Sequence, residues 1–144
     1  MSVSHILAGK GHHVVTLPAS TTILDVTKFL SENRIGAIVI AGPSGAIEGI
    51  VSERDIVRLI ATEGHAGLEK HVSSIMTKTV KTANENDSEA ELMRLMTENR
   101  IRHVPVVRDA KLIGIISIGD VVKYRIESIE RETEEMKAYI ATAG

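Results

Sequence analysis

Apolar residues occur along the chain in two kinds of pattern, short continuous runs and longer stretches with a spacing of three or four. The runs at 14–17, 36–40 and 47–51 are rich in Val and Ile, which predicts strands. Helical spacing over 23–30, and again over 56–60, predicts two helices. Thr21 or Thr22 can cap the first helix, and Ser52 opens the second. The first part of the chain is therefore predicted to fold as strand, helix, strand, strand, helix.

The same succession of elements occurs a second time. The tetrapeptide Glu-Asn-Arg-Ile at 32–35 recurs at 98–101, and the block at 49–55 is answered by a similar block at 114–120. The offset between the copies changes by one residue in a turn, where length changes are tolerated. The chain therefore carries a duplicated β-α-β-β-α unit. In the second copy the predicted elements are a strand near Val80, a helix over 89–99, strands over 103–107 and 112–116, and a helix from Ser117.

The duplication predicts an α+β fold in which the repeats pack as one pseudo-twofold module. Neither repeat alone is expected to bury two helices and a three-stranded sheet. A pseudo-twofold module also predicts two equivalent clefts at its axis. The predicted boundaries are a first repeat over 10–63, a linker over 64–76, a second repeat over 77–125 and a C-terminal helical extension over 126–144.

The predicted last helix runs from Ser117 to about Ile140 and is longer than the repeat needs. Beyond Arg125, a row of mostly apolar residues has alternating spacings of three and four. Its members are Ile126, Ile129, Thr133, Met136 and Ile140. A narrow apolar seam on an exposed helix indicates a partner helix, most simply the same helix of a second subunit.

Composition excludes several classes of protein. The 144 residues carry a formal net charge of −2, no cysteine and 2% aromatic residues. Without cysteine there are no disulfides, thiolate nucleophiles or cysteine metal sites. Few rings and no basic excess argue against a nucleic-acid platform. The apolar run at 6–8 is too short for a signal peptide, and no stretch reaches the ~20 residues of a membrane span. The expected location is cytoplasmic.

Catalytic signatures are largely missing, whereas one short motif occurs in both repeats. There is no phosphate-binding loop, and the paired histidines at 12–13 have no acidic partner at metal-ligand spacing, so we expect no metal site. Ser-x-x-Asp occurs at 52–55 and at 117–120. The motif can be a helix capping box. It can also form a nucleotide site, because hydroxyl and amide groups at a helix N-terminus bind anions and a carboxylate accepts from a ribose diol.

The chain resembles a pair of CBS (cystathionine β-synthase) domains forming one Bateman module, from residue 10 to about 125. The resemblance rests on Ile-Arg-His-Val-Pro-Val-Val at 101–107, Ile-Met-Thr at 75–77 and the two Gly-x-x-Ser-x-x-Asp segments. It implies a regulatory, non-catalytic module that binds AMP, ADP or ATP, or in some members S-adenosylmethionine or a nicotinamide dinucleotide. It also implies a homodimer and a regulated protein partner that the sequence does not identify.

The resemblance further implies how each cleft is built. In the first cleft, Asp120 would hold the ribose diol with Ser117 near the phosphate, and Arg102 and His103 would meet the phosphates. The adenine would lie among Val15, Ile35, Ala37 and Ile115, with Lys10 and His13 at the mouth. The mirror cleft would use Asp55, Ser52, Thr79, Lys81, Ile101 and Pro105, with Arg54 as a substitute cation. Because Gly36 and Ala37 stand where the second repeat has Arg102 and His103, the Asp120 cleft is expected to be the better phosphate site.

Three functions from different classes follow. The first is a non-enzymatic adenosine-nucleotide sensor in which ligand binding shifts the relative position of two modules. The second is a constitutive dimerisation or scaffold module with vestigial clefts, in which Val15, Ile35 and Ile115 are core residues only. The third is an enzyme, for which His103 is the single candidate acid–base group, with no nucleophile or metal beside it.

Overall fold

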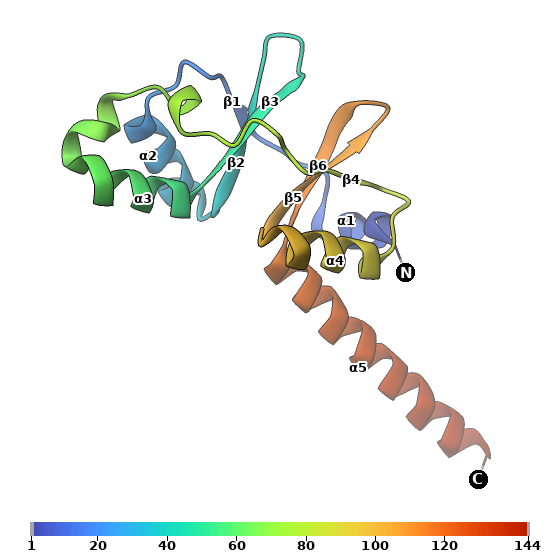
Figure 1. Cartoon of the computed structure of the whole chain (residues 1–144). Coiled ribbons are helices and arrows are strands. Elements are labelled where there is room, and N and C mark those ends of the chain that lie inside the picture. Colours follow the sequence, from blue (N-terminus) through green and yellow to red (C-terminus); the bar gives the residue numbers. More distant parts are fainter. Residues whose placement is uncertain (1, 144) are drawn as a thin grey trace.

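The computed structural model describes residues 2–143 and places the two repeats in two lobes, each built on its own three-stranded sheet (Figure 1). The elements are α1 (Val3–Lys10), β1 (Thr16–Leu17), α2 (Ile23–Asn33), β2 (Ala37–Ala41), β3 (Ile47–Ser52), α3 (Glu53–Glu63), η1 (Gly64–Glu69), η2 (Val72–Ser74), β4 (Ala83–Asn84), α4 (Glu89–Asn99), β5 (His103–Arg108), β6 (Lys111–Ser117) and α5 (Ile118–Ala143). The predicted α+β fold, with two β-α-β-β-α repeats and a long last helix, is confirmed.

The two sheets have the same topology and the same irregularity. The strand orders are β1-β2-β3 and β4-β5-β6, with a parallel pair followed by an antiparallel pair in each. The antiparallel register shifts between Ile40 and Ala41 in the first lobe and between Val106 and Val107 in the second. β2 is buried at all five positions, as expected for a continuous apolar strand covered on both faces.

Helices α2 and α4 begin and end in the same way. The hydroxyl of Thr22 accepts from the Asp25 amide at 3.2 Å, and that of Ser88 accepts from the Glu91 amide at 3.0 Å. Each hydroxyl satisfies an amide that has no partner within its helix. Both helices end on an arginine in the left-handed region, Arg34 (φ 54°) and Arg100 (φ 53°). This conformation turns the chain sharply toward the following strand.

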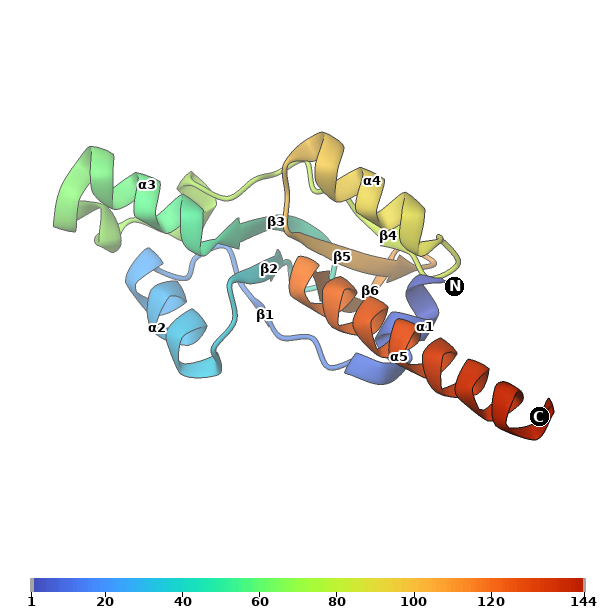
Figure 2. The same cartoon turned by 90° about the horizontal axis from the view of Figure 1, so that it is seen from below.

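Helix α1 was not predicted. It precedes the first repeat in the sequence but packs in the lobe of the second repeat. Val3, Ile6 and Leu7 are buried in the core that also holds the second sheet and α4. Gly114 on β6 allows this approach, because a Cβ there would lie 2.6 Å from Leu7 Cδ2. Helix α1 thus lies in the second lobe, beside α5, and the chain then crosses to the first lobe through residues 11–15 (Figure 2).

The start of the second repeat also differs from prediction. The strand expected near Val80 forms later, as β4 at Ala83–Asn84. The preceding segment is instead held by the first sheet, because Thr77 and Ile50 exchange two backbone hydrogen bonds of 2.9 and 3.0 Å. Within the predicted linker, Val72 is fully buried in the first core. The connection between the repeats is therefore packed against the first lobe along much of its length.

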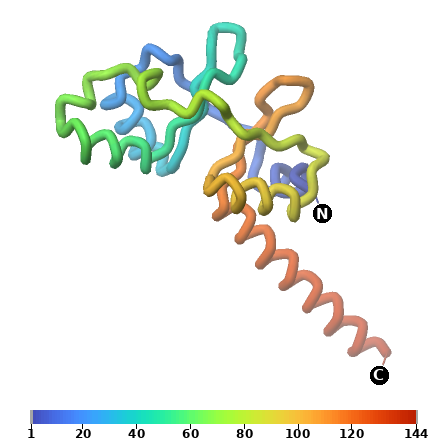
Figure 3. Tube along the Cα trace, viewed as in Figure 1, coloured from blue at the N-terminus to red at the C-terminus, as the bar shows by residue number. Residues whose placement is uncertain are grey.

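Helix α5 leaves the second lobe and extends well past it (Figure 3). Of its 26 residues, Val121 and Ser128 are buried. No helix within residues 2–143 is long and apolar enough to cross a membrane. The cytoplasmic location stays a prediction.

Candidate functional site

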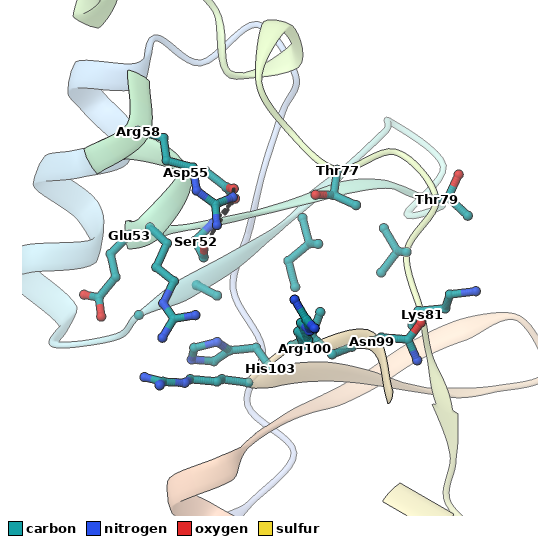
Figure 4. A pocket seen from close by; sticks show the side chains of 17 residues that line it. Ser52, Glu53, Asp55, Arg58, Thr77, Thr79, Lys81, Asn99, Arg100 and His103 are labelled. Carbon is teal, nitrogen blue, oxygen red and sulfur yellow. Dashed lines mark hydrogen bonds and ion pairs between the residues drawn. The ribbon is translucent and has the colours of Figure 1, made fainter. Parts of the chain in front are cut away.

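A cavity of about 440 Å³ lies between the two lobes, at the N-terminus of α3 (Figure 4). Its walls come from the first lobe, from the connecting segment and from the turn between α4 and β5. The lining residues are Gly36, Ala37, Ile50, Ser52, Glu53, Arg54, Asp55, Arg58, Thr77, Thr79, Val80, Lys81, Asn99, Arg100, Ile101, Arg102 and His103. We call this the Asp55 cavity.

Ser52 and Asp55 form a capping box at the edge of the cavity. Asp55 Oδ2 accepts from the Ser52 amide at 2.8 Å and lies 3.2 Å from the Ser52 hydroxyl oxygen. The other carboxylate oxygen, Oδ1, lies 4.0 Å from Arg58 Nη1. The capping box therefore uses Oδ2 of Asp55. The other oxygen, Oδ1, has Arg58 as a cationic neighbour, at the distance limit of an ion pair.

Basic side chains outnumber acidic ones in the lining of the Asp55 cavity. The cations are Arg54, Arg58, Lys81, Arg100 and Arg102, and the carboxylates are Glu53 and Asp55. Counting full charges, the lining carries a net charge of +3, in a chain whose net charge is −2. An anion with several charges is the ligand that such a lining favours.

Eight of the lining residues were not predicted from the sequence, and among them are the polar residues Arg58, Asn99 and Arg100. Arg58 lies three residues after Asp55 on α3, so both project on the same side of the helix. Arg100 was visible as part of the repeated tetrapeptide but was used only to align the copies. Its left-handed conformation at the end of α4 brings it to the cavity opposite α3 (Figure 4).

The His103 ring packs across the pseudo-twofold axis against Gly36. A Cβ on Gly36 would lie 3.2 Å from His103 Cε1, so the glycine makes room for the imidazole. Burial lowers the pKa of His103 below its usual value of 6.5, and the charges of Lys10 and Arg102 lower it further. The carboxylates of Glu53 and Asp120 act in the opposite direction without reversing the shift. The ring is thus neutral at pH 7.

In the second repeat, the carboxylate that corresponds to Asp55 is bound by a lysine of the same chain. Asp120 Oδ2 accepts from the Ser117 amide at 2.8 Å and from Lys10 Nζ at 2.5 Å. Lys10 Nζ also donates to the Ile115 carbonyl. Burial acts to raise the pKa of Asp120, but the bonds from Lys10 and Ser117 outweigh it and the pKa is lowered. Lys10 therefore binds the carboxylate that was expected to receive the ribose diol.

The structure divides the predicted site residues differently from the sequence analysis. Nine of them line the Asp55 cavity, namely Ala37, Ser52, Arg54, Asp55, Thr79, Lys81, Ile101, Arg102 and His103. Ala37, Arg102 and His103 were expected in the Asp120 cleft, and the structure places all three in the lining of the Asp55 cavity. The reason is that residues 36–37 and 102–103 meet at the axis, where His103 fills the space over Gly36.

The remaining predicted residues lie outside the lining of the Asp55 cavity. Pro105 is buried within β5, where it pairs with Ile115. Val15 and Ile35 are 36% and 39% exposed, and His13 is exposed. The hydrogen-bonded group described above is formed by Lys10, Ile115, Ser117 and Asp120. Within residues 2–143, no cluster of three or more His, Asp or Glu side chains could hold a metal ion.

The model of the CBS domain family matches the chain twice, at residues 5–62 and 72–127. The mitochondrial CBS domain-containing protein CBSX3 of Arabidopsis thaliana is 33% identical over 96% of this chain and 71% of its own length. The crystal structure of the CBS-domain containing protein ATU1752 from Agrobacterium tumefaciens is 43% identical, with a TM-score of 0.84, over 86% of this chain and 92% of that one.

Two other solved relatives are described as complexes with adenosine compounds. The CBS domain protein PAE2072 from Pyrobaculum aerophilum, complexed with AMP, is 30% identical with a TM-score of 0.75, over 83% of this chain and 89% of that one. The CBS domain pair of protein MJ0100, in complex with 5′-methylthioadenosine and S-adenosyl-L-methionine, is 26% identical with a TM-score of 0.79, over 89% of this chain and 98% of that one. From the double family match and these similarities, the chain belongs to the CBS domain family and forms one tandem CBS pair.

Proposed function

We propose that this CBS pair is a non-catalytic regulatory module that binds an adenosine nucleotide in the Asp55 cavity. The observation that carries the proposal is the combination of a carboxylate at a helix N-terminus with five cations around one cavity. The volume of about 440 Å³ lies within the usual range for small-molecule sites. The complexes of related CBS pairs with AMP and with S-adenosylmethionine support an adenosine ligand.

Each part of the ligand has matching chemistry in the cavity. Asp55 Oδ1 is proposed to accept hydrogen bonds from the ribose diol, since Oδ2 is used by the capping box. The adenine is proposed to lie on the apolar part of the lining, formed by Ala37, Ile50, Val80 and Ile101. The phosphates are proposed to bind the cations, with Arg100 and Arg102 on the side opposite α3.

The preferred cleft is therefore the reverse of the one expected from the sequence. Asp55 lines a cavity rich in cations, whereas Asp120 is bonded to Lys10. We retain the Asp120 cleft, with Ser117, Ile115, Val15, Ile35 and His13, as a second proposed site that Lys10 occupies. The two clefts are thus proposed to differ in affinity.

The charge of the lining favours anionic adenosine ligands. AMP, ADP and ATP carry increasing negative charge, whereas S-adenosylmethionine carries a sulfonium cation and no phosphate. NAD carries two phosphates but needs space for a second nucleoside. We therefore propose AMP, ADP or ATP as the ligand, with NAD and S-adenosylmethionine as alternatives.

Titration calorimetry of the whole chain tests this proposal. The ligands are adenosine, AMP, ADP, ATP, NAD and S-adenosylmethionine, at matched ionic strength. We expect saturable binding of at least one adenine nucleotide, and weaker binding of adenosine, which has no phosphate. If none of the six ligands binds, the proposal is contradicted, and the alternative of a dimerisation or scaffold module with vestigial clefts is favoured.

Dimerisation and an unidentified regulated protein partner complete the proposed function. The observation that favours a second subunit is the exposed apolar seam of α5. A nucleotide bound between the lobes can change their relative position, and a partner that contacts both lobes would detect the change.

Replacing His103 with glutamine is expected to remove the part of the AMP affinity that increases as the pH falls. Because burial holds the pKa of His103 below 6.5 in the free protein, the ring is neutral at about pH 7. A phosphate bound beside the ring favours imidazolium and raises this pKa, so binding takes up a proton. By linkage, His103 makes the affinity rise as the pH falls from about 8 to 6. Calorimetry of AMP binding across that range measures the slope.

The comparison uses both proteins because the phosphate of AMP becomes more anionic as the pH rises, which opposes the trend. Equal slopes for the parent protein and the His103→Gln variant would show that His103 does not meet the phosphate. A folding measurement provides an independent control. The unfolded chain binds the proton more readily, because the folded pKa is the lower one, so the unfolding free energy of the parent should decrease as the pH falls below about 6.5. The variant should lack this decrease in urea denaturation.

A further inference from the structure

The exposed face of α5 carries a regular apolar seam. Its members are Val122, Ile126, Ile129, Thr133, Met136 and Ile140, and the five apolar ones are 49–64% exposed. Their spacing alternates between three and four residues, which is the heptad spacing of a two-stranded coiled coil. In heptad letters, the a positions hold Ile126, Thr133 and Ile140. The d positions hold Val122, Ile129 and Met136. The seam spans 18 residue steps, or about 27 Å of helix.

The seam continues into a groove beside the body of the protein. The groove has a volume of about 580 Å³ and lies between α4 and the start of α5. Its lining includes Met93 of α4, together with Val122 and Ile126 of the seam. Arg125 of α5 is ion-paired with Glu89 of α4 at 3.6 Å and closes one side. A helix laid along the seam would therefore also cover this groove.

Charged residues beside the seam are self-complementary. In a parallel pair of helices, each g residue faces the e residue five positions later on the partner. The g positions hold Arg125 and Glu132, and the matching e positions hold Glu130 and Lys137. Both pairings, Arg125 with Glu130 and Glu132 with Lys137, bring together opposite charges. In an aligned parallel dimer, symmetry forms each pairing twice.

We infer that the occupant of the seam is the α5 helix of a second copy of this chain, parallel and in register. The register is set by Thr133, which is the only polar residue of the seam and lies at its middle, where it faces Thr133 of the second copy. A single polar residue at an a position is a recognised means of fixing register and oligomeric state. The inference rests on the dimerisation proposed above but is independent of nucleotide binding, because no residue of α5 lines the Asp55 cavity.

Cysteine cross-linking tests the register directly, because the chain has no cysteine. We expect the Thr133→Cys variant of the whole chain to form a disulfide-linked dimer under mild oxidation. Facing residues of a parallel coiled coil lie within disulfide reach. The matched control is Glu135→Cys, on the outer face of the same helical turn. We expect cross-linking of the control to be at least about tenfold slower, and equal rates would overturn the parallel, in-register arrangement.

Sedimentation of charge-reversed variants independently tests the relative orientation of the two α5 helices. Reversing Glu132 or Lys137 alone should each raise the dimer dissociation constant by about tenfold, or about 1.4 kcal/mol. The double variant Glu132→Lys with Lys137→Glu should restore the parent value, and Glu135→Lys should leave it unchanged. If neither single reversal raises the dissociation constant, the parallel, in-register arrangement is overturned. A monomeric parent chain, or a dimer unaffected by Ile129→Asp, would overturn the inference altogether.

Discussion

Replacing Lys10 with methionine is expected to raise the number of nucleotide sites from one per chain to two. In the parent protein, Lys10 Nζ binds both Asp120 Oδ2 and the Ile115 carbonyl. Methionine keeps most of the side-chain volume but cannot donate these hydrogen bonds, so the Asp120 carboxylate becomes available to a ribose diol. Titration calorimetry with AMP measures the stoichiometry. The second site should bind more weakly, because the cations of the cavity lining surround Asp55.

The control for this variant is Lys28→Met, which removes the same charge from the exposed surface of α2. It should leave one site per chain with unchanged affinity. The role assigned to Lys10 would be contradicted by a parent protein with two sites of equal affinity, or by a Lys10→Met variant that still binds one nucleotide. Circular dichroism of the variant should confirm that α1 and the second lobe are still folded.

Removing Arg100 and Arg102 together is expected to weaken ATP binding by about 100-fold. Each guanidinium is proposed to form charge-assisted hydrogen bonds with phosphate, and we assign about tenfold to each in a site open to solvent. Adenosine has no phosphate, so its affinity should change by less than about threefold. Calorimetry with ATP and adenosine on the Arg100→Ala, Arg102→Ala double variant measures both effects.

Arg34 provides a matched control for this experiment. It ends α2 in the same left-handed conformation in which Arg100 ends α4, with φ of 54° against 53°. It does not belong to the lining of the Asp55 cavity. Arg34→Ala therefore causes a comparable backbone change without removing a cation from the cavity, and ATP affinity should be unaffected. A similar loss of ATP and adenosine affinity in the double variant would show that the two arginines support the fold instead of the phosphates.

Local sequence patterns were sufficient to predict most of the secondary structure. The helix predicted over 89–99 is α4 with the same bounds, and the Thr22 cap was one of two named candidates. Helix α1 was missed because it is eight residues long and lies before the first repeat. Its burial depends on a gap over Gly114, more than 100 residues away in the sequence, and a local pattern does not contain that information.

The chemistry of the candidate site was predictable from the sequence, but the bond between Lys10 and Asp120 was not. The repeated Ser-x-x-Asp motif identified both carboxylates, because a repeated motif occupies equivalent places in both lobes. The asymmetry arises from Lys10, which is 110 positions from Asp120 in the chain and reaches it only through the packing of α1. Arg100 could have been found from the repeated tetrapeptide, had its left-handed conformation been anticipated at the end of the helix.

Nucleotide binding in the Asp55 cavity is tested most directly by calorimetry of AMP and 2′,3′-dideoxy-AMP against the parent protein and Asp55→Asn. Asparagine can still accept the capping-box hydrogen bond from the Ser52 amide but is a weaker acceptor for two hydroxyls. Hydrogen bonds to a charged group contribute about 1.5–3 kcal/mol. We therefore expect AMP affinity to fall by about 10–100-fold in Asp55→Asn, and by a similar factor when the parent is offered the dideoxy ligand. The variant should discriminate little between the two ligands, and Asp120→Asn should behave like the parent. An equal loss of dideoxy affinity in the parent and Asp55→Asn would contradict the assignment of the ribose to Asp55.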